Sequence, residues 1–376
     1  IEVVHMLQRC ILHIGTEKTG TTSIQRFLSK NRKALAKSGY FLPRSMGSLE
    51  HFDLVRALVS PEKRFGKLRH FKDDPNKIEH RQAILRKTFQ SELQSAQGFH
   101  SCIITSERLG AKITSDAEAK ALRDLLTPYF AHIEVWVYLR PQVDFARSFY
   151  STELRLGARR EAVLPDLRRS AVQQRFDYAA LLAFWQHALP NASLHPQIFD
   201  QDRLIGGNVV SDFMSKIGFD TVGLTLPRVE NQSLSVAAQI YLRAVNEACA
   251  KGSPIDRPKV VRLMNKHFAG KGRKPLERDA AKMERYFTAS NECIRAQYFP
   301  ELTSLFVGKH NYPKMETQEE MTEQDYLAIV KMLSRKPAPL NGRDLLTAVL
   351  ADSGLHISLL GRLRRWARNT TLAWRR

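Results

Sequence analysis

Several features that would assign a function class at once are missing from these 376 residues. There is no run of about 18 apolar residues, so no transmembrane helix is predicted, and no apolar signal-peptide segment precedes the first predicted strand. The four cysteines are far apart and form neither a CxxC pair nor a His/Cys spacing typical of zinc sites. Cys10 and Cys102 lie in apolar runs typical of buried free thiols. We therefore expect a cytoplasmic protein, with a native start at Met6.

Acidic residues are also scarce. The sequence has 58 Lys and Arg against 38 Asp and Glu, a net charge of +20, which predicts an anionic partner. No helix-turn-helix, zinc finger or aromatic-rich RNA-binding motif is present, so no specific nucleic-acid partner is predicted. The last twenty residues hold six arginines and no acid. They are typical of a basic amphipathic segment that contacts the inner face of a membrane, or that docks onto the protein itself.

Short apolar runs alternate with helical patterns along the first half of the chain. The predicted strands are 10–15, 39–43, 101–107 and 133–141, and the predicted helices are 21–37, 78–97, 116–129 and 143–156. This alternation predicts an α/β fold with a P-loop-like open parallel sheet flanked by helices. The second half is mostly helical, after a late strand at 193–200. We expect one domain over 6–307 and a C-terminal extension over 308–376.

A glycine-containing turn follows the first predicted strand and precedes a helix. Such a turn can bind phosphate, because the first N–H groups of the helix point outward and its dipole favours anions. The turn contains Lys18, Thr19, Gly20, Thr21, Thr22 and Ser23. In a Walker A loop the lysine follows the second glycine, whereas Lys18 precedes Gly20 by two residues. The lysine therefore approaches a bound anion from another side.

This stretch resembles the 5′-phosphosulfate loop of PAPS-dependent sulfotransferases, in particular bacterial carbohydrate or polysaccharide sulfotransferase-like proteins. Their motif runs K-[ST]-G-T-[ST] directly after the first strand. The resemblance implies that Lys18 contacts the bridging oxygen between phosphate and sulfate, and that Thr19 to Ser23 bind the 5′-phosphate. It implies PAPS as co-substrate, released as adenosine 3′,5′-bisphosphate.

A second motif agrees with the resemblance. In that family the 3′-phosphate is bound by an arginine at the end of a strand and by a serine eight residues later. Here Arg140 ends a predicted strand and Ser148 follows at that spacing. A Walker B strand would end in an acid that organises magnesium, so Arg140 predicts a reaction without a metal. The basic glycine-containing segment 268–276 implies further cofactor contacts from Lys271 and Arg273.

Transfer to a hydroxyl or amine also needs a base for the acceptor's proton. Glu107 is the last residue of the predicted strand 101–107, at the carboxyl end where parallel sheets bind ligands, and in some carbohydrate sulfotransferases the base is a glutamate. His51 is the second candidate. The sequence thus predicts a sulfotransferase that acts on a carbohydrate such as a polysaccharide or glycolipid. A P-loop kinase or other ATP-dependent phosphotransferase and a noncatalytic polyanion-binding protein are the alternatives.

Overall fold

In the computed structural model of the chain, the described residues are 6–63, 74–227, 233–253, 255–307 and 312–314. They divide into two compact units. Unit 1 takes Ile1–Gln142, Leu167–Asn231 and Tyr286–Gly308, and unit 2 takes Val143–Asp166, Gln232–Arg285 and Lys309–Arg376. The predicted C-terminal extension over 308–376, with its basic amphipathic segment, lies almost wholly outside the described residues, so it stays a prediction. Among the described helices, none is both long and apolar enough to cross a bilayer.

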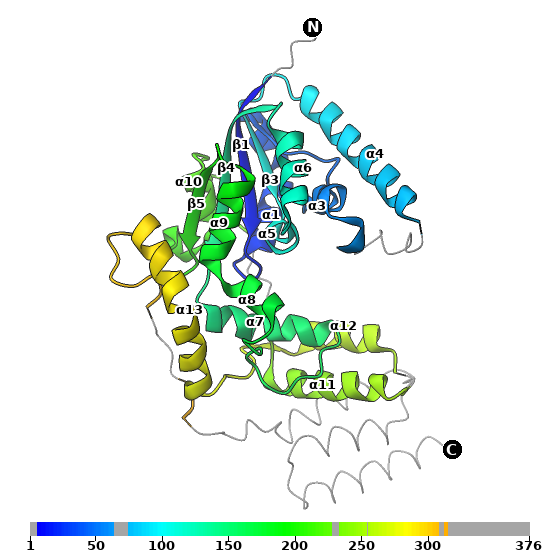
Figure 1. Cartoon of the computed structure of the whole chain (residues 1–376), viewed down its shortest axis with the longest axis vertical. Helices are drawn as coiled ribbons and strands as arrows, with labels where there is room; N and C mark the ends of the chain where they lie inside the picture. The colour runs from blue at the N-terminus through cyan, green and yellow to red at the C-terminus, as the bar shows by residue number, and fades with distance from the viewer. Residues whose placement is uncertain (1–5, 64–73, 228–232, 254, 308–311, 315–376) are drawn as a thin grey trace, which may run out of the picture. The chain divides into compact units, whose positions relative to one another are not determined.

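Unit 1 contains a five-stranded parallel sheet in the order β2-β3-β1-β4-β5 (Figure 1). The strands are β1 (Leu7–Gly15), β2 (Tyr40–Phe41), β3 (Ser101–Thr105), β4 (Phe130–Leu139) and β5 (Ser193–Ile198). The three central strands carry continuous buried stretches, as expected for a sheet covered on both faces. The predicted α/β class and parallel sheet are confirmed.

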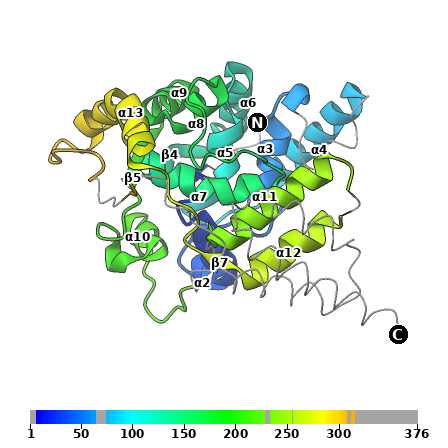
Figure 2. The same ribbon diagram turned by 90° about the horizontal axis from the view of Figure 1, so that it is seen from below.

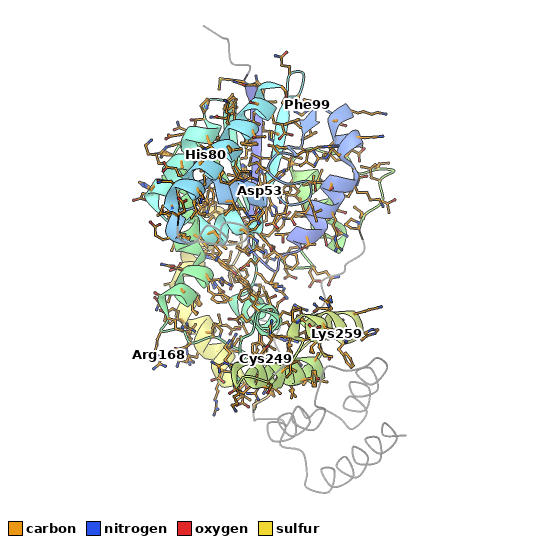
Figure 3. All side chains as sticks on the ribbon, turned by 90° about the vertical axis from the view of Figure 1, so that its right-hand side faces the viewer. Asp53, His80, Phe99, Arg168, Cys249 and Lys259 are labelled. Atoms are coloured by element: carbon orange, nitrogen blue, oxygen red, sulfur yellow. The ribbon has the colours of Figure 1, made fainter. Side chains whose placement is uncertain are left out.

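Helices connect these strands and cover the sheet (Figure 2). Those of unit 1 are α1 (Thr21–Lys30), α2 (Arg32–Lys37), α3 (Phe52–Leu58), α4 (Pro75–Gln94), α5 (Glu107–Lys112), α6 (Asp116–Leu126), α8 (Ser170–Phe176), α9 (Tyr178–Ala188) and α10 (Val209–Lys216). Asp53 and His80, labelled in Figure 3, mark α3 and α4, which pack against each other. The core on the α1 side joins Phe27 and Leu28 to Tyr138 and Phe213. This packing fixes α1, and with it the turn that precedes α1.

The predicted helix 21–37 is interrupted at Asn31, which separates α1 from α2. The helical hydrogen bonds nevertheless continue across it, from Asn31 N to Phe27 O and from Leu35 N to Asn31 O, each 3.0 Å. The sequence prediction missed three short helices, α3, α5 and α8. Each is only six or seven residues long, too short for an apolar repeat to be recognised.

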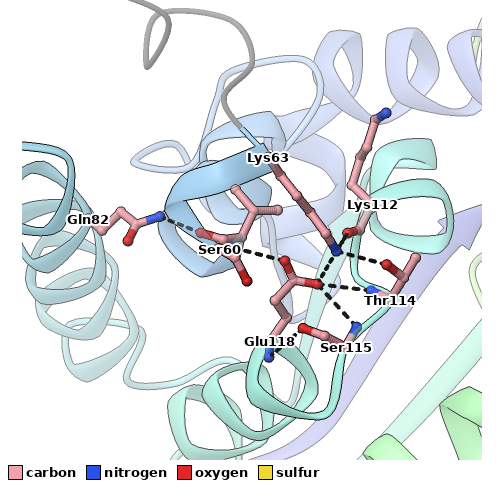
Figure 4. Close-up of polar contacts among 8 residues, drawn as sticks. Ser60, Lys63, Gln82, Lys112, Thr114, Ser115 and Glu118 are labelled. Carbon is pink, nitrogen blue, oxygen red and sulfur yellow. Dashed lines mark hydrogen bonds and ion pairs between the residues drawn. The ribbon is translucent and has the colours of Figure 1, made fainter. Parts of the chain in front are cut away.

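A buried carboxylate anchors the segment that follows α5 (Figure 4). Glu118 on α6 forms a capping box with Ser115 and also accepts hydrogen bonds from Ser60 N and Lys63 Nζ, at 2.8 and 2.5 Å. Burial would raise the pKa of Glu118, but the hydrogen bonds from Lys63 and from backbone N–H groups hold it below its usual value. Lys63 also donates to the carbonyl of Lys112, the last residue of α5. The network thus holds the end of the helix that begins with Glu107.

The described part of unit 2 is mostly helical and includes one short pair of strands. It holds most of α7 (Gln142–Arg155), then α11 (Val236–Ala250), α12 (Arg257–His267), the first part of α13 (Glu277–Tyr298), and the antiparallel pair β6 (Ser233–Leu234) and β7 (Ala269–Gly270). Its core includes Tyr150, Leu242 and Met264. Cys249 and Lys259 in Figure 3 mark α11 and α12, which are in contact.

Candidate active site

The turn after β1 is tied to the neighbouring strand. Thr16 donates to the carbonyl of Tyr138 on β4 through its N–H, at 3.1 Å, and through its hydroxyl, at 2.9 Å. The Thr19 hydroxyl donates back to Thr16 O at 2.6 Å. Gly20 has a φ of 78°, and a Cβ there would lie 2.6 Å from the Val209 side chain. Glycine is therefore required at the start of α1, whose N-terminus receives no side-chain cap.

Arg140 lies directly after β4 and reaches this turn. Its Nη1 donates to the carbonyl of Lys18 at 2.9 Å, and its guanidinium lies 5.6 Å from the centre of the Phe199 ring. The Tyr178 hydroxyl, at the start of α9, donates to Arg140 O at 2.7 Å. Lys18 itself adopts a left-handed backbone with φ 66°. The two predicted cofactor motifs therefore meet in unit 1.

The other predicted 3′-phosphate residues belong to unit 2. Ser148 lies on α7, and Lys271 and Arg273 lie in the segment that follows β7. There Arg147 donates to the carbonyls of Lys271 and Arg273, at 2.9 and 3.2 Å, and Arg273 N donates to Gln239 at 2.8 Å. The basic segment is thus folded onto α7 and α11. A part in cofactor binding stays a prediction for these three residues.

Glu107 is the first residue of α5 and lies beside the turn. The Thr21 hydroxyl, in the first turn of α1, donates to Glu107 Oε2. A Cβ on Gly15 would lie 3.2 Å from Glu107 Cα, so the two backbones are closely packed. We call the turn after β1, from Thr16 to Gly20, the lysine turn. Because β1 and β3 are adjacent and parallel, their carboxyl ends bring the lysine turn and the candidate base Glu107 to one edge of the sheet.

His51, the second candidate base, has a different environment. It is 1% exposed. Its Nδ1 accepts a hydrogen bond from Thr105 N at 2.9 Å, so its Nε2 carries the proton and donates to Pro43 O at 3.0 Å. Burial lowers its pKa to about 4. Both ring nitrogens therefore serve the backbone, which favours a structural role and leaves Glu107 as the stronger candidate.

Sequence reasoning missed an ion pair at the turn. Glu17, next to Lys18, lies 3.3 Å from Arg175 on α8, measured from Oε2 to Nη1. Burial raises the pKa of Glu17, Arg175 partly offsets this, and the negative charge of Glu107 adds to the increase. The position of Glu17 inside the turn could have marked it in the sequence as a candidate site residue. Nothing in the sequence marked Arg175, because only folding brings α8 to the turn.

A third carboxylate, Glu50, was also missed. Its Oε1 accepts a hydrogen bond from Ser106 at 2.9 Å and lies 3.6 Å from Arg108 Nε. Burial raises the pKa of Glu50, the hydrogen bond from Ser106 lowers it, and the charge of Glu107 raises it. The charge of Glu107 therefore acts on two neighbouring carboxylates, Glu17 and Glu50, and like-charged groups placed close together are common at catalytic sites.

Comparisons of the sequence with known proteins add little evidence about function. No protein-family model matches the chain. An uncharacterized protein of Archaeoglobus fulgidus is 27% identical over 216 residues, which are 53% of this chain and 57% of that protein. The chain thus spans just over half the length of this relative.

Two solved structures are similar to this chain. The crystal structure of a sulfotransferase from Alicyclobacillus acidocaldarius is 12% identical, covers 76% of this chain and 94% of its own, and has a TM-score of 0.37. The sulfotransferase domain from the Synechococcus PCC 7002 olefin synthase is 11% identical, covers 57% of this chain and 75% of its own, and has a TM-score of 0.28. Scores this low carry no argument about activity, so the function has to be argued from the residues themselves.

Proposed function

We propose that the chain is a sulfotransferase that moves the sulfuryl group of PAPS to a hydroxyl or amine of a carbohydrate acceptor. One observation carries the proposal: the Arg140 side chain donates to the carbonyl of Lys18. The two motifs that resemble the sulfotransferase family are 122 residues apart in sequence, yet they meet at one sheet edge. The residue that follows β4 is a cation, where a Walker-type kinase would need an acid.

The residues of the turn fit the 5′ end of such a cofactor. The start of α1 has neither a side-chain cap nor an acidic residue in its first turn, so its N–H groups can bind an anion. The hydroxyls of Thr19 and Thr21 already donate to Thr16 O and Glu107. We therefore assign the 5′-phosphate to backbone N–H groups and to the hydroxyls of Thr22 and Ser23, and the 3′-phosphate to Arg140.

When bound, PAPS would supply the sulfuryl group. In this assignment the Lys18 ammonium stabilises the negative charge that develops on the departing phosphate. Glu107 accepts the proton of the acceptor, and Thr21 holds one carboxylate oxygen so that the other faces the acceptor. The new bond from sulfur to the acceptor's oxygen or nitrogen would replace the sulfur–oxygen bond to the phosphate, and the acceptor's proton would pass to Glu107.

Thermal unfolding in the presence of nucleotides tests the proposal. Adenosine 3′,5′-bisphosphate should raise the melting temperature more than adenosine 5′-phosphate or ATP with magnesium does, because ligand binding to the folded state stabilises it. Arg140→Ala should reduce the effect of the bisphosphate far more than that of adenosine 5′-phosphate. Stabilisation by ATP–magnesium alone would favour a kinase, and equal losses for both adenosine ligands would remove Arg140 from the 3′-phosphate site.

A further inference from the structure

A long stretch of unit 1 contains cations and no acids. Between Glu17 and Glu50 the sequence has seven Lys and Arg and not one Asp or Glu. The stretch begins at the lysine turn and continues through α1 and α2 to the segment after β2 (Figure 2). An imbalance of this size over 32 residues produces a positive potential on one part of the surface.

Helix geometry gathers three of these cations on one side. Lys30, Lys33 and Lys37 follow one another at spacings of three and four residues and are all exposed. The hydrogen bonds that cross Asn31 keep α1 and α2 nearly continuous, so this spacing places the three side chains along one face. We call these lysines, together with Arg32 and Arg44, the basic face.

A hollow of about 570 Å³ lies within the basic face. Its lining includes Lys30, Arg32, Lys33 and Arg44, together with Ser29 and Ser48, and no carboxylate. The nearby Glu92 is occupied by the backbone, because it accepts hydrogen bonds from Arg44 N and Ser45 N at 2.7 and 2.8 Å. Burial and the neighbouring charge of Arg44 lower the pKa of Arg32, and the negative charge of Glu92 partly offsets this. Two like charges are thus held close together, an arrangement that a bound anion would relieve.

The surroundings indicate what kind of anion fits. On α1 and α2 no large hydrophobic side chain is exposed, which disfavours insertion into a membrane surface. The lining of the hollow contains no aromatic side chain on which bases could stack. Lys30 lies ten residues beyond Gly20 along α1, about 15 Å at the rise of an α-helix. A ligand that reaches both the turn and the basic face must therefore be extended, as a chain of several linked sugars is.

We infer that the basic face binds an anionic polysaccharide, with carboxylate or sulfate groups, whose chain extends toward the lysine turn. This inference rests on the proposed function, since it names the acceptor as a polyanionic rather than a neutral glycan. The hydroxyls of Ser29 and Ser48 supply neutral donors beside the cations, which suits a ligand that carries both charged groups and hydroxyls.

Direct binding to polygalacturonate, a carboxylated polysaccharide, tests the inference. Lys30→Glu/Lys33→Glu should lower the affinity at least about tenfold, because each reversed charge repels the carboxylates of the polysaccharide. The matched control is Arg81→Glu/Lys87→Glu, which changes the net charge equally at two exposed positions of α4 and should change the affinity less than about twofold. Lys30→Arg/Lys33→Arg should retain binding.

Two results would overturn the inference: equal losses in both charge-reversal variants, or a loss of binding to single-stranded DNA or phosphatidylserine vesicles while polygalacturonate binding stays unchanged. Stabilisation by adenosine 3′,5′-bisphosphate reports separately on the proposed function. This stabilisation should be the same in the wild type and in both charge-reversal variants. If the wild type shows no such stabilisation, the sulfotransferase assignment fails, and the polysaccharide measurement still decides the role of the basic face.

Discussion

The lysine turn and the basic face are both rich in cations, but they differ in how those charges are balanced. Around the turn, Glu17 is paired with Arg175, Glu50 with Arg108, and Glu107 accepts from Thr21. The hollow of the basic face is lined by four cations and no carboxylate. Balanced charges hold side chains in fixed positions, as catalysis requires, whereas unbalanced ones attract a partner from solution. We therefore propose that the first region carries out the chemistry and that the second binds the partner.

The largest expected effect comes from removing the central cation of the turn. Lys18→Ala should lower kcat for sulfuryl transfer by about a thousandfold, since one charged group that stabilises the transition state is lost. Circular dichroism and thermal unfolding check that the fold is retained, and polygalacturonate binding should remain within about twofold of wild type. Undiminished transfer would remove Lys18 from the chemistry and weaken the contrast between the two regions.

A smaller effect is expected at the candidate base. Glu107→Gln keeps an oxygen that can accept the Thr21 hydrogen bond but cannot take a proton, so kcat should fall by about a hundredfold. His51→Gln is the contrasting variant. It should lower the melting temperature, because the buried Thr105 N–H and Pro43 O lose their partner, and leave kcat nearly unchanged in the folded protein. The reverse pattern would make His51 the base.

The smallest effect concerns stability. Arg175→Gln should lower the free energy of unfolding by about 1–3 kcal/mol at pH 7, because it leaves the Glu17 carboxylate half-buried without its cation. Burial raises the folded-state pKa of Glu17 above its ordinary value of 4.5, and Arg175 opposes that increase. Because the folded protein holds the Glu17 proton more tightly than the unfolded chain does, this proton stabilises the fold below pH 4.5. That contribution is lost as the pH rises through the folded-state pKa of Glu17. The variant raises that value further, so its loss of stability should be larger at pH 7 than at pH 4.

Chemical denaturation at both pH values measures this difference. Arg159→Gln breaks an exposed pair with Glu247, whose charged atoms are 3.7 Å apart, and should cost less than about 1 kcal/mol at either pH. If Arg175→Gln behaves like this control, the Glu17–Arg175 pair does not position the turn.

Much of unit 1 was predictable because its elements are coded locally. The alternation of apolar runs with helical patterns predicted the parallel sheet, and the chain position of Lys18, Glu107 and Arg140 directly beside strand ends predicted one shared edge. The short helices α3, α5 and α8 were missed because they have too few turns to show a period. His51 was kept as the second candidate base because its burial and backbone partners cannot be read from "LEHFDL".

The sequence by itself determined the α/β class, the glycine-containing turn with its early lysine, and the excess of positive charge. These features depend on apolar periodicity, on glycine positions and on composition. The first two are set by near neighbours in the chain, and the third does not depend on the fold. Only the tertiary structure decided that Arg140 reaches the Lys18 carbonyl, that Arg175 pairs with Glu17, and that four cations surround one hollow. Those contacts join residues up to about 160 positions apart, and they exist because packing of the helices on the sheet brings the distant segments together.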